Sequence, residues 1–290
     1  MVKPLLRAMR PLQWPKNAFV LAPLVFGGGL FDIAVVSRAL IALGSFCAAS
    51  SAVYLFNDIR DREADREHPL KRHRPIAAGT LPVPVAGLAS LLLVGVAAAG
   101  CRFLGLHFAL ILAIYLALNL GYTLGLKNVV ILDVLIVSSG FVLRVLAGGA
   151  ATSVAISRWL ALCTTFVALF LVLSKRRHEI VLLAGDASRQ RHVLHQYSPQ
   201  FLDQMINVVT ASTVVCYALY AVSPETLEKY NTEDLIFTLP MVLFGIFRYL
   251  FLIYQTTHKR NPTESMLADV PFLLNLLIWG AAVTWIVYGR

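Results

Sequence analysis

Four oxygen-bearing side chains are spaced for metal binding in a short stretch between two apolar runs: Asn57, Asp58, Asp61 and Asp65. If the preceding helix continues to the residue before Pro69, they fall within roughly a 100° arc at about 100° per residue. Carboxylates this close repel one another unless a cation lies between them. Oxygen-only ligands suit Mg²⁺, which binds one or two carboxylates together with substrate phosphates. The spacing therefore predicts a Mg²⁺ site with these four residues as ligands and the three aspartates as catalytic groups.

A basic loop bounded by prolines follows the acids and contains Lys71, Arg72 and Arg74. Arginine offers a planar fork for phosphate oxygens, and lysine offers a point charge. Acids that hold Mg²⁺ beside bases that hold phosphate describe a diphosphate site. Two plainer interpretations stay open: the acids could form a solvated, salt-bridged helix end, and the bases could serve only to set membrane topology.

The composition indicates an all-α polytopic membrane protein. Hydrophobic residues are 58% of the 290 and charged residues 14%, whereas soluble domains have about 45–50% and about 25%. About nine apolar segments approach or reach the roughly 20 residues of a membrane-spanning helix: 16–31, 36–56, 82–103, 106–124, 129–150, 157–175, 207–223, 236–255 and 270–288. The first contains Pro23 and three glycines, so we expect it to be tilted or broken. With no linker visible, we predict one integral membrane domain over 1–290.

Basic residues are distributed unevenly between the two sides of these spans. With the N-terminus in the cytoplasm, most of the 25 Lys and Arg residues fall in cytoplasmic segments, as the positive-inside rule requires. We therefore predict a multi-pass protein of the bacterial cytoplasmic membrane with a cytoplasmic N-terminus. A transporter would place polar groups near the bilayer midplane and contain inverted repeats. Here the polar residues gather at one rim, which favours an enzyme.

Three motifs resemble the UbiA superfamily of intramembrane prenyltransferases. "NDIRDREADREHPLKRHRPIAAG" at 57–79 is similar to its first aspartate-rich motif, "RPLQWPKN" at 10–17 to its N-terminal Arg-Pro…Lys-Asn motif, and "YTLGLKN" at 122–128 to its Tyr…Lys signature. The likeness spans most of the chain, and nine helices is the number in that superfamily. It implies a helical bundle with a polar site facing the cytoplasm and a cavity open to lipid. It also adds Lys16, Asn17, Tyr122 and Lys127 to the expected site.

The second aspartate-rich motif of that superfamily is altered here. In "SKRRHE" at 174–179, Lys175 stands where the first acid is expected and Glu179 where the second is expected. Fewer acids and more bases suit a donor that carries phosphate beyond its diphosphate. "REHPLKRHRPIAAG" at 66–79, "LDVLIVSSGFVLRVLAGG" at 132–149 and "SKRRHE" resemble one branch of the superfamily, the decaprenyl-phosphate phosphoribosyltransferases.

That resemblance implies Mg²⁺-dependent transfer of 5-phosphoribosyl from phosphoribosyl pyrophosphate (PRPP) to a polyprenyl phosphate, with release of diphosphate. The alternative is a UbiA-type prenyltransferase that moves a prenyl chain from its diphosphate to an aromatic acceptor. We expect no nucleic-acid partner, and the sequence leaves open whether the protein is a homo-oligomer.

The remaining expected contacts come from other segments of the same rim. Arg144 lies within a span, where an arginine is costly and faces a cavity or a partner; a phosphate contact and a pair with Asp133 both stay open. Glu179 is expected to touch either a ribose hydroxyl or the metal. The predicted substrate-binding residues are Lys16, Asn17, Asn57, Lys71, Arg72, Arg74, Tyr122, Lys127, Asp133, Arg144, Lys175, Arg176, Glu179 and Arg260.

Overall fold

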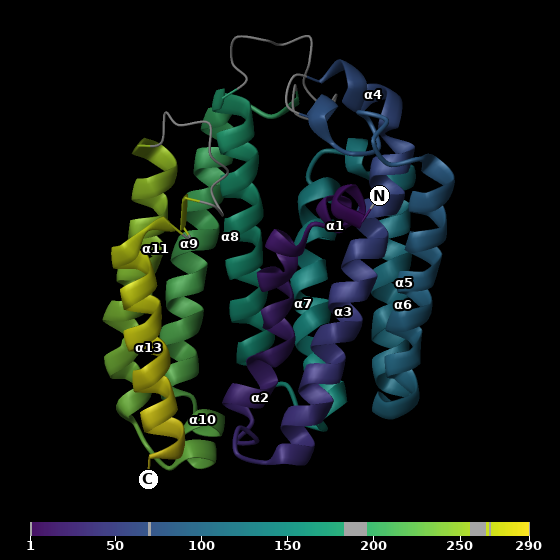
Figure 1. Ribbon diagram of the computed structural model, residues 1–290. Helices are drawn as coiled ribbons and strands as arrows, with labels where there is room; N and C mark the ends of the chain where they lie inside the picture. The colour runs from purple at the N-terminus through teal and green to yellow at the C-terminus, as the bar shows by residue number, and fades with distance from the viewer. Residues whose placement is uncertain (1, 69–70, 183–195, 256–264, 267, 290) are drawn as a thin grey trace. The chain divides into compact units, whose positions relative to one another are not determined.

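Long helices make up most of the chain in the computed structural model, which describes residues 2–68, 71–182, 196–255, 265–266 and 268–289 (Figure 1). Eight helices among these residues are long and apolar enough to cross a membrane. They are α3 (Ile33–Arg60), α5 (Val83–Leu104), α6 (Leu106–Leu124), α7 (Leu132–Thr152), α8 (Arg158–Leu182), α9 (Pro199–Val222), η6 with α11 (Asp234–Thr238 and Leu239–Gln255) and α13 (Val270–Tyr288). The prediction of an all-α multi-pass membrane protein is confirmed, and about nine spans is close.

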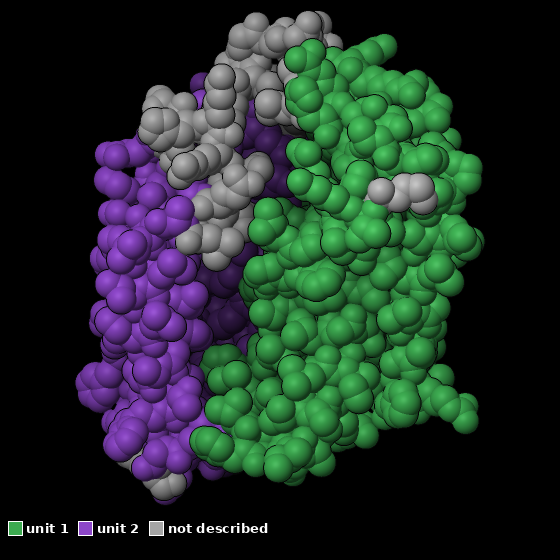
Figure 2. All heavy atoms as spheres, viewed as in Figure 1, with its two compact units in different colours: residues 1–156 green, residues 157–290 purple. Residues whose placement is uncertain are grey.

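The chain divides into two compact units, Met1–Ile156 and Ser157–Arg290, here called unit 1 and unit 2 (Figure 2). Unit 1 runs from α1 (Val2–Met9) to α7, and unit 2 runs from α8 to α13. The aspartate-rich motif and the basic loop lie in unit 1, whereas the altered second motif lies in unit 2. The single domain predicted over 1–290 stays a prediction.

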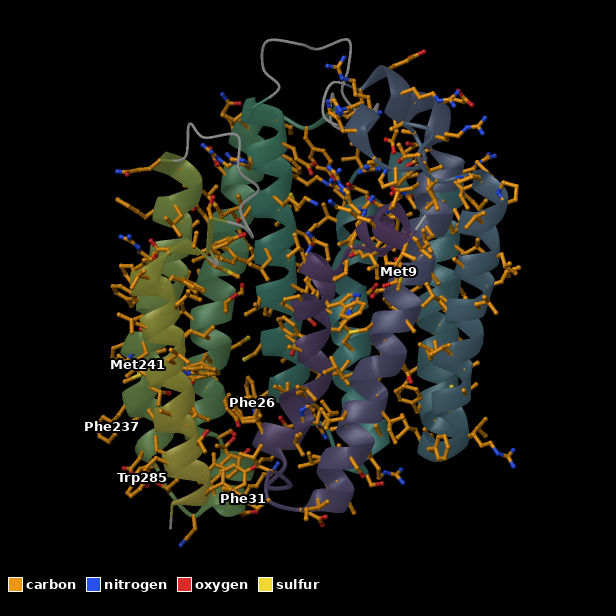
Figure 3. All side chains as sticks on the ribbon, viewed as in Figure 1. Met9, Phe26, Phe31, Phe237, Met241 and Trp285 are labelled. Carbon is orange, nitrogen blue, oxygen red and sulfur yellow. The ribbon has the colours of Figure 1, made fainter. Side chains whose placement is uncertain are left out.

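The first apolar segment is broken rather than a single spanning helix. Pro11–Leu21 form a 3₁₀ helix (η1) and Ala22–Phe26 form a short α-helix (α2). Runs of 3₁₀ helix this long are uncommon, and Pro15 inside it has no N–H to donate. The chain leaves α2 through glycines and reaches Phe31, which is exposed (Figure 3). Prolines and glycines therefore explain why the predicted 16–31 span is not one helix.

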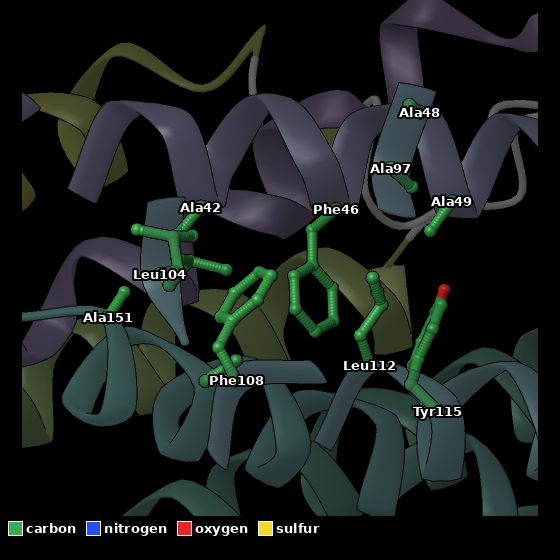
Figure 4. Packing of buried hydrophobic residues seen from close by; sticks show 12 residues of the cluster. Ala42, Phe46, Ala48, Ala49, Ala97, Leu104, Phe108, Leu112, Tyr115 and Ala151 are labelled. Carbon is green, nitrogen blue, oxygen red and sulfur yellow. The ribbon is translucent and has the colours of Figure 1, made fainter. Parts of the chain in front are cut away.

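Small side chains and one aromatic cluster hold the helices of unit 1 together. Phe46 of α3 packs edge to face against Phe108 of α6, with ring centroids 6.0 Å apart, and the Tyr115 ring lies 5.1 Å from Phe46 (Figure 4). Most buried residues of α3 are Ala or Ser. A Cβ on Gly100 of α5 would lie only 2.1 Å from Ser45 Oγ. Close approach through small residues is how helices pack in lipid, so α3 is firmly seated in its unit.

Unit 2 exposes apolar side chains and pairs several of its polar groups with one another. Phe237 and Trp285 are 72% and 73% exposed and project outward from the unit (Figure 3). The Tyr217 hydroxyl shares a hydrogen bond of 2.6 Å with Thr238 Oγ1 and accepts one of 3.2 Å from Trp279 Nε1. This arrangement suits a surface in contact with lipid, where every polar group needs a partner inside the protein.

The aspartate-rich motif lies where α3 passes into α4 (Arg62–Glu67). α3 ends at Arg60 because Asp61 departs from helical geometry, with φ −89° and ψ 6°. Backbone hydrogen bonds still run from Asp61 N to Asn57 O at 2.9 Å and from Asp65 N to Asp61 O at 2.8 Å. His68 is extended, with ψ 129°, as the residue before a proline should be. The predicted continuation of the helix to this point is correct, except that it is interrupted at Asp61.

Candidate active site

Asp58 and Asp65 form a buried cluster with two arginines. Arg10 Nη2 donates to Asp58 Oδ1 at 2.5 Å. Arg74 Nη1 donates to Asp58 Oδ1 at 2.9 Å and to Asp65 Oδ2 at 2.6 Å. The side chains of Asp58 and Asp65 are 2% and 5% exposed. Buried charges are tolerated when they are paired, so Arg74 is the bridge that allows two carboxylates to lie together.

Asn57 and Asp61 form a second cluster with a lysine from the connection between α6 and α7. Lys127, on the 3₁₀ turn η3 (Leu126–Asn128), donates to Asp61 Oδ1 at 2.5 Å. Asn57 Nδ2 donates to Asp61 Oδ2 at 3.1 Å, and Thr123 Oγ1 donates to Asn57 Oδ1 at 3.4 Å. Each carboxylate oxygen of Asp61 therefore has a donor.

The four predicted metal ligands thus form two groups instead of one. Across the described ranges, no three His, Cys, Asp or Glu residues lie close enough to hold a metal ion together. The helix is interrupted at Asp61, and the carboxylates bind different cations, Arg74 and Lys127. The four side chains are thus paired with different cations here, and the Mg²⁺ site that they are expected to form stays a prediction.

One oxygen of the motif is suited to a cation. Asp58 Oδ2 is buried and has no hydrogen-bond partner among the residues that the structure describes. A buried polar atom in this state calls for an explanation, of which a bound ion is one. Mg²⁺ needs only one or two carboxylates when substrate phosphates complete its coordination. Asp58 therefore fits the expected metal, with Asn57, Asp61 and Asp65 nearby in the chain.

Burial raises the pKa of the Asp65 carboxyl above its ordinary value of 3.8. The charges of Arg74 and Lys71 act in the opposite direction but offset only part of this effect. The ionised form of Asp65 is thus held in the folded protein at a cost in free energy. Carboxyl groups held this way are common at functional sites.

Apolar side chains beneath the charges hold three segments of the site together. Ala8 of α1, Leu55 of α3, and Ile76 and Leu81 after the basic loop are at most 1% exposed and belong to one cluster with Ala86. Full burial of such side chains stabilises by about 1.5–3 kcal/mol each for the larger ones. The basic loop is consequently anchored by its apolar end, which places Arg74 against the aspartates.

The N-terminal segment is fixed to α3 by polar contacts as well. Trp14 Nε1 donates to Ser51 Oγ at 3.1 Å, and Ser51 Oγ donates to the Met9 carbonyl at 3.0 Å. Arg10, which lies between Met9 and Trp14 in the chain, has a φ of 56°. This is the left-handed region that residues other than glycine seldom adopt. Sequence reasoning missed Arg10 as a partner of Asp58. The available signal was topology, since both residues are expected at the cytoplasmic rim.

Arg144 is buried in α7 and is satisfied by neutral groups. Its guanidinium donates to Asn17 Oδ1 at 2.8 Å, to the Gly140 carbonyl at 2.7 Å and to the Tyr115 hydroxyl at 3.1 Å. The suggested pair with Asp133 is wrong, because that residue lies eleven positions earlier in α7, or about 16 Å along the helix at 1.5 Å per residue. The phosphate contact of Arg144 stays a prediction.

The other predicted residues of unit 1 lie on elements around the two clusters. Lys71 and Arg72 are on η2 (Lys71–His73), and Tyr122 is near the C-terminal end of α6. Asp133 is completely buried in the first turn of α7. Lys16 is half-buried on η1, next to the buried Asn17.

The altered second motif lies on the last turns of α8 in unit 2. Glu179 Oε2 accepts from Arg176 Nη1 at 2.9 Å, and Glu179 Oε1 lies 3.6 Å from Lys175 Nζ. Glu179 is therefore paired with residues of its own helix, three and four positions earlier. The predicted contact Arg260 lies outside the described residues.

Comparison with protein families matches residues 18–279 to the UbiA prenyltransferase family. Two relatives are similar over 98% of this chain. The decaprenyl-phosphate phosphoribosyltransferase of Mycobacterium tuberculosis (strain ATCC 25618 / H37Rv) is 40% identical with 94% of its length covered, and that of Corynebacterium glutamicum is 37% identical with 86% covered. A solved UbiA homolog from Archaeoglobus fulgidus, bound to GPP and Mg²⁺, is similar with a TM-score of 0.73 and 18% identity, over 99% of this chain and 98% of that one.

Proposed function

Because this chain belongs to the UbiA prenyltransferase family, we propose that it is a membrane phosphoribosyltransferase. It moves 5-phosphoribosyl from PRPP to a polyprenyl phosphate of the decaprenyl type and releases diphosphate. The observation that carries this proposal is the 37–40% identity, over 98% of the chain, with proteins named for that activity. The reaction takes place at the cytoplasmic face of a bacterial inner membrane, with the N-terminus on the same side.

The end of α8 favours this reaction over prenyl transfer. A second pair of acids would add another metal site for a prenyl diphosphate. Here Glu179 is paired with Lys175 and Arg176 of its own helix, and with Arg177 the segment holds three bases for one acid. Excess positive charge suits PRPP and a lipid phosphate, which together carry more phosphate than a prenyl diphosphate does.

The carboxylates of unit 1 are the groups that would hold Mg²⁺. Asp58 is the best placed, through its buried Oδ2, with Asn57, Asp61 and Asp65 as further ligands. When bound there, Mg²⁺ supplies Lewis-acid stabilisation of negative charge on the diphosphate. Arg74 keeps Asp58 and Asp65 together, and Lys127 orients Asp61. These contacts position the acids before substrate arrives, so little reorganisation is needed.

One bond forms and one breaks at C1 of the ribose. An oxygen of the lipid phosphate attacks C1, the bond from C1 to the diphosphate oxygen breaks, and the electron pair leaves with the diphosphate. The attacking phosphate is already an anion, so no side chain has to remove a proton. The residues of the site hold anions in place and stabilise charge as it shifts to the leaving group.

The predicted basic residues take that role. Lys71, Arg72 and Arg74 contact phosphate oxygens from the basic loop, and Lys127 does so from η3. The proposal extends to the other predicted contacts: Lys16, Asn17, Tyr122, Asp133, Arg144, Lys175, Arg176, Glu179 and Arg260.

The test uses purified protein with polyprenyl phosphate and PRPP labelled in the ribose, with and without Mg²⁺. We expect the label to enter the organic phase only when Mg²⁺ is present. A parallel reaction contains a labelled prenyl diphosphate and an aromatic acid. Label transfer in this second reaction alone would replace the proposed function by prenyl transfer.

A further inference from the structure

A small cavity lies beside the aspartate-rich motif and has walls that are mostly basic. It has a volume of about 200 Å³ and is lined by Arg7, Ala8, Arg10, Asp58, His73, Arg74 and Pro75. The lining comes from three segments that the buried cluster of Ala8, Leu55 and Ile76 holds together. The cavity is therefore a built feature of unit 1 rather than a gap between loosely placed loops.

The charges around the cavity do not balance. Three guanidinium groups and one carboxylate line it, and Arg74 is also paired with Asp65 behind the wall, which leaves an excess of one positive charge. Asp58 already accepts hydrogen bonds from Arg10 and Arg74 through a single oxygen. Arg7 is exposed and forms no ion pair among the described residues. A membrane protein needs basic residues at this rim for topology, but topology does not require them to converge on one cavity.

The size of the cavity limits what it can hold. Sites that enclose a whole small molecule have volumes of about 300–1,000 Å³. A cavity of about 200 Å³ suits one compact group of a larger substrate. Arginines bind phosphate through paired N–H groups, and His73 adds an imidazole to the wall.

We propose that this cavity binds one phosphate group of the substrates other than the departing diphosphate. The group is either the 5-phosphate of the donor or the phosphate of the lipid acceptor, since both present the same chemistry. Asp58 connects the cavity with the metal site, because its carboxylate belongs to both. The identity of the phosphate rests on the proposed function, whereas anion binding by the cavity does not. Arg7 is the specific new contact, and it belongs to the N-terminal helix α1.

The test compares Arg7→Gln with Lys3→Gln. Both residues are exposed cations on α1, but only Arg7 lines the cavity. The first measurement is binding of inorganic phosphate to the detergent-solubilised protein by calorimetry. We expect Arg7→Gln to weaken it about tenfold or more, as for a lost hydrogen bond to a charged group, and Lys3→Gln to change it by less than about twofold. Arg7→Lys should restore part of the affinity, because it keeps the charge but not the fork.

The second measurement is the KM for each substrate in the transfer assay. A higher KM for PRPP in Arg7→Gln, with kcat little changed, identifies the donor's 5-phosphate; a higher KM for polyprenyl phosphate identifies the acceptor's phosphate. Phosphate affinity equal to that of the wild type in Arg7→Gln would overturn the proposal. If the wild-type protein transfers no phosphoribosyl, the proposed function fails, and phosphate binding alone still decides whether the cavity holds an anion.

Discussion

The acids at the end of α3 and the acid at the end of α8 are neutralised in different ways. Asp58 is paired with Arg10 and Arg74, which are 48 and 16 residues away, and Asp61 is paired with Lys127, 66 residues away. Glu179 is paired with Lys175 and Arg176 of its own helix. The Asp58 side chain is 2% exposed, whereas that of Glu179 is 29% exposed.

This difference indicates which acids have a position fixed by the fold. Pairs three and four residues apart occur on any exposed helix and contribute about 0.2–0.5 kcal/mol. Pairs between distant segments need the whole unit to be folded, and burial makes each charge depend on its partner. The end of α3 therefore has the features of a preorganised site, whereas at the end of α8 it is a base, Arg177, that pairs with a distant segment through Asp203 of α9.

The largest expected effect comes from removing the buried charge at the end of α3. Asp58→Asn should lower Mg²⁺-dependent phosphoribosyl transfer by about 10³-fold, since the metal contributes several kcal/mol and each 1.36 kcal/mol is about tenfold. Activity is measured with labelled PRPP over a range of Mg²⁺ concentrations, alongside the thermal midpoint.

Asp32→Asn is the matched control. Asp32 is exposed at the other end of α3, where its side chain accepts hydrogen bonds from Ala34 N and Val35 N, and Asn keeps an acceptor there. This variant should retain full activity. If Asp58→Asn folds and remains as active as Asp32→Asn, the end of α3 is not the metal site. The ends of α3 and α8 would then not differ in metal binding.

Sequence reasoning succeeded where the relevant geometry is local. The four-residue spacing of Asn57 and Asp61 predicted neighbours on one helix face, and the structure joins them by a hydrogen bond of 3.1 Å. The prolines and glycines of the first segment predicted a broken helix. Both results depend only on helix periodicity or on backbone chemistry within a few residues.

It failed where partners are distant in the chain. Nothing in a local pattern selects Arg10 as the partner of Asp58, or Asn17 as the partner of Arg144 127 residues away. The left-handed backbone of Arg10 and the interruption at Asp61 likewise result from packing around them. A regular helix predicted one set of four ligands, and the pattern gave no sign that Asp58 and Asp61 would bind different cations from other segments.

A smaller effect is expected when the bridging cation is changed but its charge is kept. Arg74→Lys should reduce activity about 10–100-fold, the usual loss when a group that orients ligands is altered. Arg74 Nη1 donates to both Asp58 and Asp65, and a lysine ammonium, a compact charge on a flexible stem, has no planar guanidinium to hold it in that position. Arg62→Lys is the control, because Arg62 pairs with the neighbouring Glu63 on the exposed side of α4. Equal activity of the two variants would mean that charge alone matters at position 74.

The end of α8 should tolerate loss of its acid better. Glu179→Gln is expected to lower kcat/KM by less than about tenfold, since a partly exposed ion pair contributes about 0–1 kcal/mol, and to leave the Mg²⁺ dependence unchanged. The assay is the same titration with Mg²⁺, and Glu67→Gln on exposed α4 is the control. A large loss of activity together with a much higher Mg²⁺ requirement would make Glu179 a metal ligand and remove the contrast between the two helix ends.

The smallest effect concerns stability rather than catalysis. Burial raises the pKa of Asp65 above 3.8, so the ionised carboxylate costs free energy of folding at neutral pH. Asp65→Asn removes that cost and should unfold at the same or a higher temperature than the wild type at pH 7.5, whereas most substitutions destabilise by about 0.5–3 kcal/mol. Its advantage should shrink as the pH falls through the folded-state pKa of Asp65, because the wild-type carboxyl then becomes neutral as well.

Glu63→Gln provides a control of opposite sign. Hydrogen bonding from Arg62 lowers the pKa of the exposed Glu63 below 4.5, so its carboxylate stabilises the protein at neutral pH, and the contribution is lost as the pH falls through the lowered pKa. Thermal unfolding of both variants at pH 7.5 and pH 4 tests the pair. The opposite outcome is a lower unfolding midpoint for Asp65→Asn than for the wild type, with a larger difference at pH 7.5 than at pH 4. That result would mean that the bond to Arg74 outweighs burial. In that case the buried Asp65 of α4 would stabilise the fold as well as hold the metal, and the site would not reduce stability.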